Sequence, residues 1–512
     1  MSKIVIIVCV LIALCSCHDG ADNPYKELSI DSFSTLKADK YAIDAKKIRI
    51  NINKLSYRDG ISLTTDRFIR NYYSNEEPFI WISRIGVYDR ADSLIQIIKK
   101  ADRYGIDKSM LRVTEIEKDL KCFRTLDVSS GKNDINHVMA RLEYNLTKAY
   151  LRYLTGIKFG FINPDHLYNN LEKDTIDSIN TRYRQLSELR VERPDNDFFR
   201  QMICEAFNDN INKQLSEIHP KSILYEKLIN RLNNDKLSYK DRMKTNCNIE
   251  RCRWRFKILS GQNTTDKLVE VNIPSYSLMA KEKDHTLSMR VACGTIKHKT
   301  PLLSSKIVRM DINPQWIIPK SIAKGFIGRH EYMHKMGMFV IDKKEGKLPA
   351  EMASYKKLME GEQYIVQAGG PKNSLGRIIF RFDNGFSVFL HDTSSPWLFQ
   401  RTYRALSHGC VRVEKPYELA IFLLNDKDEK LEDKLKYSMT VEFVNDNDSI
   451  AKQKKVKIDR KRIINSLSVK PAVPLVITYY TIYFNNKGEL IEYQDVYGYD
   501  KVLADKLDPF VK

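Results

Sequence analysis

One stretch decides the fold of the C-terminal half of this chain: Arg377-Ile378-Ile379-Phe380-Arg381-Phe382-Asp383-Asn384-Gly385-Phe386-Ser387-Val388-Phe389-Leu390-His391. Two runs of mostly apolar, strand-favouring residues flank an Asn-Gly pair, the strongest short-range signal for a β-hairpin. The pattern predicts an antiparallel hairpin whose second strand ends at His391. A side chain at the end of a strand is held by a rigid scaffold, so His391 is a candidate functional residue.

Outward from this hairpin, the chain divides into a helical part and a later, mostly β part. Apolar residues at helical spacing predict helices first, and alternating apolar residues predict strands after residue 266. The predicted helices cover about 94–101 (ended by Gly105), 135–153 (ended by Gly156), 197–207 and 222–233, with another opened by Pro416; the predicted strands cover 268–273, 287–293, 306–312, 474–484 and 489–493. Charge-rich residues 425–435 and 446–461 are expected to be solvated connectors. This order predicts an α+β fold, with an N-terminal helical domain followed by a mixed, mostly β domain.

A chemically suggestive run, Ser407-His408-Gly409-Cys410-Val411-Arg412, places Cys410 19 positions after His391. This arrangement suits thiol acyl transfer. A thiolate is the nucleophile, a nearby imidazole removes the thiol proton, and backbone N–H groups beside a glycine hold the oxyanion. Three other interpretations stay open: an inert buried thiol at Cys410, a core histidine at His391, and zinc bound by His391, His408 and Cys410.

The charge balance of the chain favours an anionic partner. The 512 residues include 84 Lys and Arg against 65 Asp and Glu, which gives a net charge of +19. No zinc-finger spacing, RNA-binding motif or helix-turn-helix pattern supports nucleic acid as that partner. The basic residues are spread along the chain, so an acidic wall polymer and an anionic membrane surface fit equally well.

The first residues resemble a bacterial lipoprotein signal. Lys3 precedes an apolar run, Ile4 to Leu14, that is too short to span a bilayer, and the run leads into Leu14-Cys15-Ser16-Cys17. The resemblance implies lipidation of Cys17. An uncleaved anchor and ordinary secretory cleavage are the alternatives, and all three place the mature chain beyond the cytoplasmic membrane. We therefore expect a lipid-anchored protein on the periplasmic face of the envelope.

The remaining cysteines predict neither a disulfide framework nor a metal site. Export permits disulfides, but the spacings of these cysteines form no recognisable pattern. Cys247 and Cys252 lack two further zinc ligands nearby, so we expect them to be buried or helix-face thiols. The cysteines outside the signal are Cys122, Cys204, Cys247, Cys252, Cys293 and Cys410.

The motif around Cys410 resembles the signature of the L,D-transpeptidases, whose catalytic domain is YkuD-like. His391-Asp392-Thr393 precedes it, and further blocks in the same order match the large periplasmic subgroup. These blocks are Glu250 to Trp254, Val271 to Pro274, Thr300-Pro301, Asn313 to Pro319, Gln367 to Gly376, Tyr479 to Thr481 and Asp495 to Asp500. Together they cover roughly residues 75–510. Each block alone is weak, and their common order carries the resemblance.

The resemblance assigns roles residue by residue. Cys410 matches the nucleophile and His391 the general base, whose ring the carbonyl of Asp392 orients. His408, Gly409 and Cys410 match the segment that lines the oxyanion site, and Ser407 is grouped with them as an oxyanion or orienting residue. A further set matches positions that shape the substrate cleft: Arg412, Asn373, Gly376, Tyr332 and Met333. Arg412 either braces the loop or meets a substrate carboxylate, since its fork suits carboxylates.

The resemblance also implies a domain plan: a signal peptide over 1–17, a linker and N-terminal region over 18–74, a helical scaffold domain over 75–262, and a catalytic domain over 266–512. The catalytic domain would include a capping loop over 320–361 and a C-terminal strand extension.

Two features depart from the family pattern. No peptidoglycan-binding module fits between Leu232 and Glu250, and Asp392 stands where the family has glycine.

The expected activity is peptidoglycan 3→3 cross-linking through a cysteine thioester, with a tetrapeptide donor and the side-chain amine of a diamino acid as acceptor. No cofactor, metal or nucleic acid is implied, and carbapenem-type β-lactams are expected to acylate Cys410. Three alternatives stay open: an L,D-carboxypeptidase, a ligase that joins a protein to peptidoglycan, and a non-catalytic wall-binding scaffold. A catalytic thiolate is also expected to alkylate at a lower pH than an ordinary cysteine does.

Overall fold

The computed structural model describes residues 42–83, 86–129, 131–175, 181–260, 265–425, 428–441 and 458–511. The chain divides into two compact units, each built from separate stretches of sequence. The first contains the residues up to Lys158, Arg193–Pro220 and Pro509–Lys512, and the second contains Phe159–Glu192 and Lys221–Asp508. Helices between 221 and 253 therefore belong to the same unit as the strands, which differs from the division expected at 262–266.

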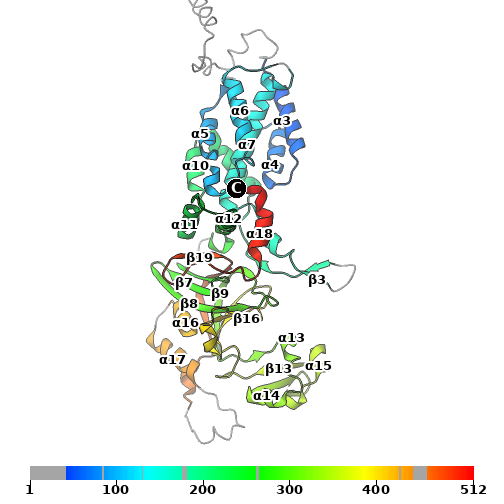
Figure 1. The fold of residues 1–512 in the computed structure, drawn as a ribbon. Coiled ribbons are helices and arrows are strands. Elements are labelled where there is room, and N and C mark those ends of the chain that lie inside the picture. Colours follow the sequence, from blue (N-terminus) through cyan, green and yellow to red (C-terminus); the bar gives the residue numbers. More distant parts are fainter. Residues whose placement is uncertain are drawn as a thin grey trace, which may run out of the picture. The chain divides into compact units, whose positions relative to one another are not determined.

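The first unit is a helical bundle around α7 (Ile135–Phe159), which belongs to this unit up to Lys158 (Figure 1). Side chains of α7 bond to the neighbouring helices: Tyr144 donates to Asp59, Arg141 pairs with Asp119, and Tyr150 donates to the carbonyl of Met202. The other elements are α3 (Ala45–Asp59), α4 (Thr64–Ser74), β1 (Ile82–Ser83), β2 (Gly86–Val87), α5 (Asp89–Ile98), η2 (Ala101–Tyr104), α6 (Val113–Arg124), η3 (Gly131–Asn133), α9 (Asn196–Phe207) and α10 (Ile211–Glu217).

The helical predictions in this unit are confirmed apart from one boundary. The predicted apolar face of α7 is buried, and Gly105 caps η2 in a left-handed conformation. The prediction that Gly156 ends α7 is wrong, because the helix continues to Phe159. Gly160 follows with φ +72°, and a Cβ there would lie 2.4 Å from an oxygen of Glu250. Left-handed geometry and close packing, which a single sequence does not reveal, set this boundary.

The second unit is built on a sheet that closes on itself. Its strands follow the order β14-β15-β17-β8-β7-β6-β18-β9, and β14 also pairs with β9, so the path forms a ring. Its members are β6 (Lys267–Asn272), β7 (Ser277–Glu282), β8 (His285–Gly294), β9 (Leu302–Ile312), β14 (Ile378–Phe382), β15 (Leu390–His391), β17 (Val411–Val413) and β18 (Ser466–Thr478). Two short strands extend it: β5 (Ser187–Glu188) pairs with β9, and β16 (Ala405–Ser407) pairs with β8.

Helices and two short hairpins complete this unit around the ring. Leu228, Ile249 and Ile482 belong to one buried cluster that joins α11, α12 and β19. The remaining elements are α8 (Pro164–Tyr168), β3 (Lys173–Thr175), β4 (Thr181–Tyr183), α11 (Ile223–Leu232), α12 (Tyr239–Arg253), η4 (Lys257–Leu259), η6 (Pro396–Gln400), α16 (Pro416–Leu423), α17 (Glu429–Thr440), η8 (Arg460–Arg462), β19 (Ile482–Phe484), β20 (Leu490–Glu492), α18 (Tyr499–Leu507) and η9 (Asp508–Phe510), whose last residues belong to the first unit.

The segment expected to be a capping loop is a folded insertion with its own core. A four-stranded sheet in the order β10-β13-β11-β12 packs with short helices around Ile318, Met333 and Ile365. Its elements are β10 (Trp316–Ile317), α13 (Lys320–Ala323), α14 (His330–Lys335), β11 (Met338–Asp342), β12 (Gly346–Leu348), η5 (Ala350–Met352), α15 (Tyr355–Glu360) and β13 (Gln363–Gln367).

Three local predictions need correction. The hairpin forms, but β15 is only two residues long, because the side chain of Asn384 bonds the backbone of residues 386 and 388 within the turn. Most of 425–435 is helix rather than connector, since α17 begins at Glu429 with Asp428 as its N-cap. The strand predicted over 474–484 is interrupted between β18 and β19. Of 446–461, the part up to 457 lies outside the described residues.

None of the helices in the described ranges is both long enough and apolar enough to cross a bilayer.

Candidate active site

The register of two neighbouring strands brings the predicted catalytic residues together. β15 and β17 run parallel, and His391 lies directly opposite Arg412. Cys410 directly precedes β17, and its side chain lines the same cavity as those of His391 and Arg412. His391 and Arg412, 21 positions apart along the chain, therefore become neighbours in the sheet, with Cys410 just before β17.

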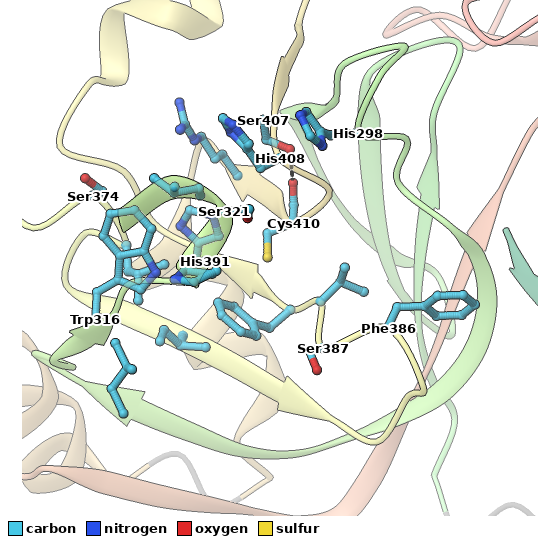
Figure 2. Close-up of a pocket in the computed structure, with 18 of the residues that line it drawn as sticks. His298, Trp316, Ser321, Ser374, Phe386, Ser387, His391, Ser407, His408 and Cys410 are labelled. Carbon is cyan, nitrogen blue, oxygen red and sulfur yellow. Dashed lines mark hydrogen bonds between the residues drawn. The ribbon is translucent and has the colours of Figure 1, made fainter. Parts of the chain in front are cut away.

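These residues face one cavity of about 530 Å³, and Figure 2 shows the Cys410 sulfur and the His391 ring directed into it. One wall comes from the strand ring. The other comes from the insertion, with Trp316 and Ile317 on β10 and Ser321 and Ile322 on α13. The lining includes two arginines and three histidines but no aspartate or glutamate. This composition makes the cavity suited to an anionic or electron-rich ligand.

His391 is held as a neutral imidazole with one nitrogen left to accept a proton. The residue is 4 % exposed, and its Nδ1 lies 2.5 Å from the carbonyl oxygen of Asp392. A carbonyl can only accept, so Nδ1 carries the proton and Nε2 keeps its lone pair. Burial and the charge of Arg412 lower the pKa of His391 to about 4, while the carbonyls of Asp392 and Leu375 act in the opposite direction. The ring can therefore act as a base at neutral pH.

Cys410 rests as a thiol rather than as a thiolate. Burial raises its pKa above the ordinary value, and a backbone hydrogen bond from Phe389 and the charge of Arg412 only partly offset this effect. The pair therefore consists of a neutral thiol and a neutral imidazole. A neutral thiol favours alkylation at a higher pH than the resting thiolate considered in the sequence analysis would require.

Two hydrogen bonds of Ser407 fix the loop that carries Cys410. Its Oγ donates to the carbonyl of Cys410 at 2.5 Å and accepts from the N–H of Gly409 at 3.1 Å. Gly409 has φ +119°, which favours glycine at this position. Because Ser407 uses the Gly409 N–H, that group is not the oxyanion donor that the sequence suggested. No described residue accepts a hydrogen bond from the N–H of Cys410, which leaves that donor for a ligand.

Basic side chains line the edge of the cavity beside the nucleophile. The rings of His408 and His298 stack with their centroids 4.6 Å apart, and both line the cavity. Burial, His298 and Arg412 lower the pKa of His408. Arg412 forms no ion pair with any described residue, and its buried Nε has no hydrogen-bond partner there. His298 was not among the residues predicted from the sequence, although it lies only two residues before the Thr300-Pro301 block.

Three of the predicted residues, Asn373, Gly376 and Asp392, do not line the cavity but contact the segments that form it. The amide of Asn373 is buried and bonds the carbonyls of Pro314 and Ala368. Gly376 has φ +67°, and a Cβ there would lie 2.4 Å from the side chain of Asp392. The Asp392 carboxylate accepts from the N–H groups of Arg377 and Thr393, both at 2.7 Å. These contacts hold the residue whose carbonyl orients His391.

Tyr332 and Met333 do not reach the cavity. Met333 is fully buried in the core of the insertion, and Tyr332 stacks on Phe326. Helix α14 folds onto the insertion's own sheet, so these side chains serve its packing. Trp316 and Ile322 form the part of the cavity wall that was expected from Tyr332 and Met333. Cys17 lies outside the described residues.

No cluster of metal ligands occurs within the described ranges. Burial raises the pKa of the Cys247 and Cys293 thiols to about 12 and that of Cys252 higher still. All six cysteines of the described chain are free, and among these six only Cys410 lines the large cavity.

Comparison with known proteins agrees with this geometry. The family model of the L,D-transpeptidase catalytic domain (YkuD) matches residues 266–442, and a model described as a Scaffold domain matches residues 67–232. A protein of Haemophilus influenzae, named provisionally as an L,D-transpeptidase, is 27 % identical over 243 residues. The match covers 45 % of this chain and 44 % of that protein, so it spans less than half the length of this relative.

Solved structures of L,D-transpeptidases are similar at a more remote level. The enzyme from Mycobacterium smegmatis shows 12 % identity and a TM-score of 0.19, covering 42 % of this chain and 59 % of the other. L,D-transpeptidase 3 of Mycobacterium tuberculosis shows 11 % identity and a TM-score of 0.17, covering 29 % and 52 %. The assignment rests on the two family models: residues 67–232 form a Scaffold domain, and residues 266–442 form a catalytic domain of the L,D-transpeptidase (YkuD) family.

Proposed function

We propose that this chain is a peptidoglycan L,D-transpeptidase that uses Cys410 as its nucleophile and forms 3→3 cross-links between stem peptides. One observation carries the proposal. In a cavity without acidic residues, Cys410 lies beside a buried neutral imidazole whose proton is fixed on Nδ1. A thiol beside an oriented base is the arrangement that covalent acyl transfer requires.

In the first half-reaction, the Cys410 sulfur attacks the carbonyl of the third residue of a donor tetrapeptide, and His391 Nε2 takes the thiol proton. The N–H of Cys410 stabilises the oxyanion of the tetrahedral intermediate. The C–N bond to the terminal D-alanine then breaks, and His391 returns the proton to the leaving amine. The products are a thioester on Cys410 and free D-alanine. The carbonyls of Asp392 and Leu375 favour the charged ring that forms transiently.

In the second half-reaction, the side-chain amine of the diamino acid on another stem peptide attacks the thioester. His391 accepts a proton from this amine and transfers it to the departing sulfur, which restores the thiol. A new amide bond replaces the thioester, so the reaction needs no cofactor. Water in place of the amine would give a carboxypeptidase, and a lysine amine would give attachment of a protein.

The charge of the cavity supports an acidic donor. Stem peptides carry free carboxylates, and the cavity offers Arg412 without an acidic partner among the described residues. A guanidinium can hold such a carboxylate through two parallel hydrogen bonds. Arg412 is opposite His391 in the strand register, so a carboxylate bound there would lie close to the reacting carbonyl.

The cellular location forms part of the same proposal. The apolar run from Ile4 to Leu14, followed by Cys17, supports export and lipidation at the periplasmic face of the envelope. Peptidoglycan is accessible there. The same thiol chemistry would make Cys410 the residue that a carbapenem acylates, since the strained β-lactam carbonyl presents the same kind of electrophile.

The test is the turnover of a disaccharide-tetrapeptide by the full-length chain, followed by mass spectrometry of the products. The wild type is expected to release D-alanine and form a cross-linked dimer. Cys410→Ala should abolish both products, and His391→Gln should reduce the rate by about 100-fold or more, in the range of a lost general base. A dimer formed by Cys410→Ala would exclude the proposal. Release of tripeptide without formation of the dimer would show instead that the chain hydrolyses the donor peptide.

A further inference from the structure

The carbonyl of Gly409, the residue before the nucleophile, is held by a residue from a distant part of the sequence. Thr300 Oγ1 donates to this carbonyl at 2.8 Å, and the interaction is buried. Thr300 is itself completely buried and lies near the end of the loop that connects β8 to β9. It does not line the cavity, so it cannot touch a ligand there.

The planarity of the peptide bond turns this contact into control of a catalytic group. The carbonyl of Gly409 and the N–H of Cys410 belong to one peptide unit and point in opposite directions. When Thr300 fixes the carbonyl on the buried side, the N–H is fixed toward the other side. Ser407 holds the peptide units on either side, through the N–H of Gly409 and the carbonyl of Cys410. Two hydroxyl groups thus fix three consecutive peptide units around the nucleophile.

We propose that Thr300, held in place by Tyr497, is a positioning residue that aims the Cys410 N–H at the oxyanion of the acyl-transfer intermediate. This inference rests on the proposed function only for the identity of the acyl group. The hydrogen bonds that carry it are independent of any substrate.

Tyr497 fixes Thr300 through two further hydrogen bonds. Its hydroxyl donates to the carbonyl of Gly294 at 2.7 Å and accepts from the N–H of Thr300 at 3.1 Å. The N–H of Gly294 donates to Thr300 Oγ1 at 2.8 Å, which leaves the Thr300 hydroxyl proton for Gly409. A Cβ on Gly294 would lie 1.9 Å from the carbonyl oxygen of His298, so these backbones approach as closely as glycine allows.

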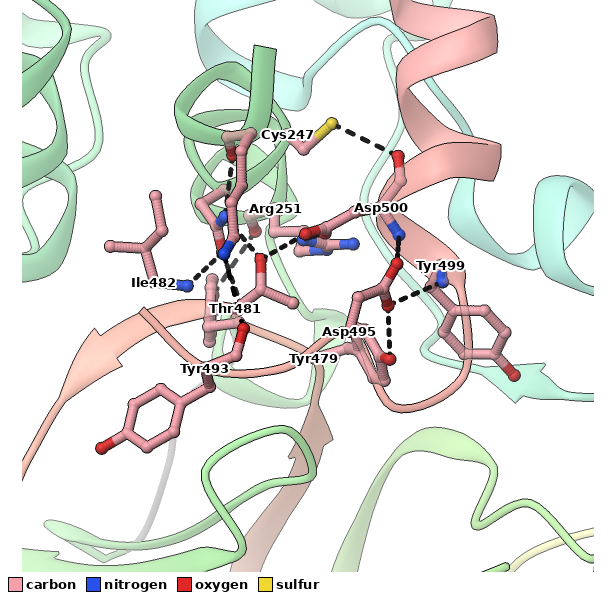
Figure 3. Close-up of polar contacts among 12 residues, drawn as sticks. Cys247, Arg251, Tyr479, Thr481, Ile482, Tyr493, Asp495, Tyr499 and Asp500 are labelled. Carbon is pink, nitrogen blue, oxygen red and sulfur yellow. Dashed lines mark hydrogen bonds and ion pairs between the residues drawn. The ribbon is translucent and has the colours of Figure 1, made fainter. Parts of the chain in front are cut away.

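The C-terminal segment holds Tyr497 in turn. The hydroxyl of Tyr479 accepts from the N–H of Tyr497 and donates to Asp495, both at 2.6 Å. Figure 3 shows Asp495 also bonded at the start of α18, where Asp500 pairs with Arg251 of α12. The recognised blocks at 250–254, 479–481 and 495–500 thus meet in one buried network that ends at the peptide unit before Cys410.

Thr300→Val tests the proposal, because valine keeps the shape of threonine and removes the hydroxyl. Acylation of Cys410 by p-nitrophenyl acetate passes through an oxyanion, whereas alkylation by iodoacetamide does not. Loss of one oxyanion donor slows the chemical step by about 100- to 1,000-fold. A misdirected donor should slow it less, so we expect acylation of Cys410 to slow by about 10- to 100-fold. Alkylation should stay within about twofold, since the thiol and His391 are unchanged. Tetrapeptide turnover should lose kcat while KM stays nearly constant.

Three further variants complete the test. Thr300→Ser keeps the hydroxyl and should restore most of the acylation rate, and Tyr497→Phe should show a smaller loss of the same kind. Tyr150→Phe removes another buried tyrosine hydroxyl, one bonded to Met202 in the helical unit, and should lower the melting temperature without slowing acylation. Equal slowing of acylation and alkylation in Thr300→Val, or no slowing of either, would overturn the proposal. Neither probe is a peptidoglycan fragment, so failure of the chain to turn over tetrapeptide would count against the proposed function alone.

Discussion

At the scale of single residues, the sequence singled out Cys410 and His391 as a candidate catalytic pair but did not predict their protonation states. Cys410 and His391 could be found because their motif and spacing are distinctive. The pKa of each group depends on how completely it is buried and on which charges lie nearby, and both follow from tertiary packing. The low pKa of His391 and the raised pKa of Cys410 therefore required the structure.

The neutral pair predicts the pH profile of alkylation. Since burial raises the pKa of Cys410, its reaction with iodoacetamide should increase with pH to a midpoint above that of an ordinary cysteine. The rate can be followed by intact-mass spectrometry between pH 5 and 10, with exposed Cys204 as an internal reference. A midpoint for Cys410 below that of Cys204 would show that the thiolate is already formed in the resting site.

The low pKa of His391 also predicts that acid destabilises the folded chain. The pKa is about 4 in the folded state and 6.5 ordinarily, so between these values the unfolded state binds the extra proton. Stability from this residue is therefore complete above pH 6.5 and is lost as the pH falls toward 4, by roughly 3 kcal/mol. His391→Gln should remove this dependence. The free energy of unfolding can be measured in urea at pH 7 and pH 4.5 for the wild type and for His391→Gln. If it changes by the same amount in both proteins, His391 is not buried as a neutral ring.

Gly376 is predicted to be irreplaceable for a reason specific to the site. Gly376→Ala would place a Cβ 2.4 Å from Asp392, whose carbonyl orients His391. Gly488→Ala is the matched control, because φ is +76° there but no atom lies within 4 Å. Both variants should lose about 1–3 kcal/mol from backbone strain, and Gly376→Ala should additionally lose acylation activity by more than about tenfold. Equal activity of the two variants would exclude a positioning role for this contact.

At the scale of elements, the positions of most helices and strands followed from periodicity, while their ends did not. The hairpin at 377–391 was predictable from Asn384-Gly385, yet the side chain of Asn384 shortens its second strand by bonding the turn backbone. Helix α17 was missed because half of its residues are charged, and its helical state depends on the cap at Asp428 and the packing of Leu435.

The buried ion pair between α12 and α18 should contribute to stability far more than an exposed one. Arg251 and Asp500 lie 2.6 Å apart, with their side chains 2 % and 15 % exposed. Removing one partner leaves the other charge buried, so Arg251→Met should lower the free energy of unfolding by about 3–5 kcal/mol. Lys283→Ala removes the exposed pair with Asp266 and should cost less than about 1 kcal/mol. Similar losses in urea titrations of both variants would contradict this account of the α12–α18 contact.

At the scale of the whole molecule, the sequence predicted the fold class but not the assignment of segments to units. A helical region followed by a mostly β domain was readable from the change of period near residue 266. The sequence did not reveal that residues 159–192 and 221–253 belong to the same unit as the sheet. This assignment depends on tertiary contacts such as that between Gly160 and Glu250. The folded insertion was also missed, since its short strands pair only with one another.

The most direct test of the central claim is to locate the covalent intermediate. The full-length chain would be incubated with a carbapenem, digested, and mapped by mass spectrometry. The account predicts one adduct, on the peptide that contains Cys410, which disappears in Cys410→Ala and forms at least about 100-fold more slowly in His391→Gln. An adduct on another residue, or none on a folded wild-type chain, would contradict the assignment of Cys410 as the acyl-accepting nucleophile.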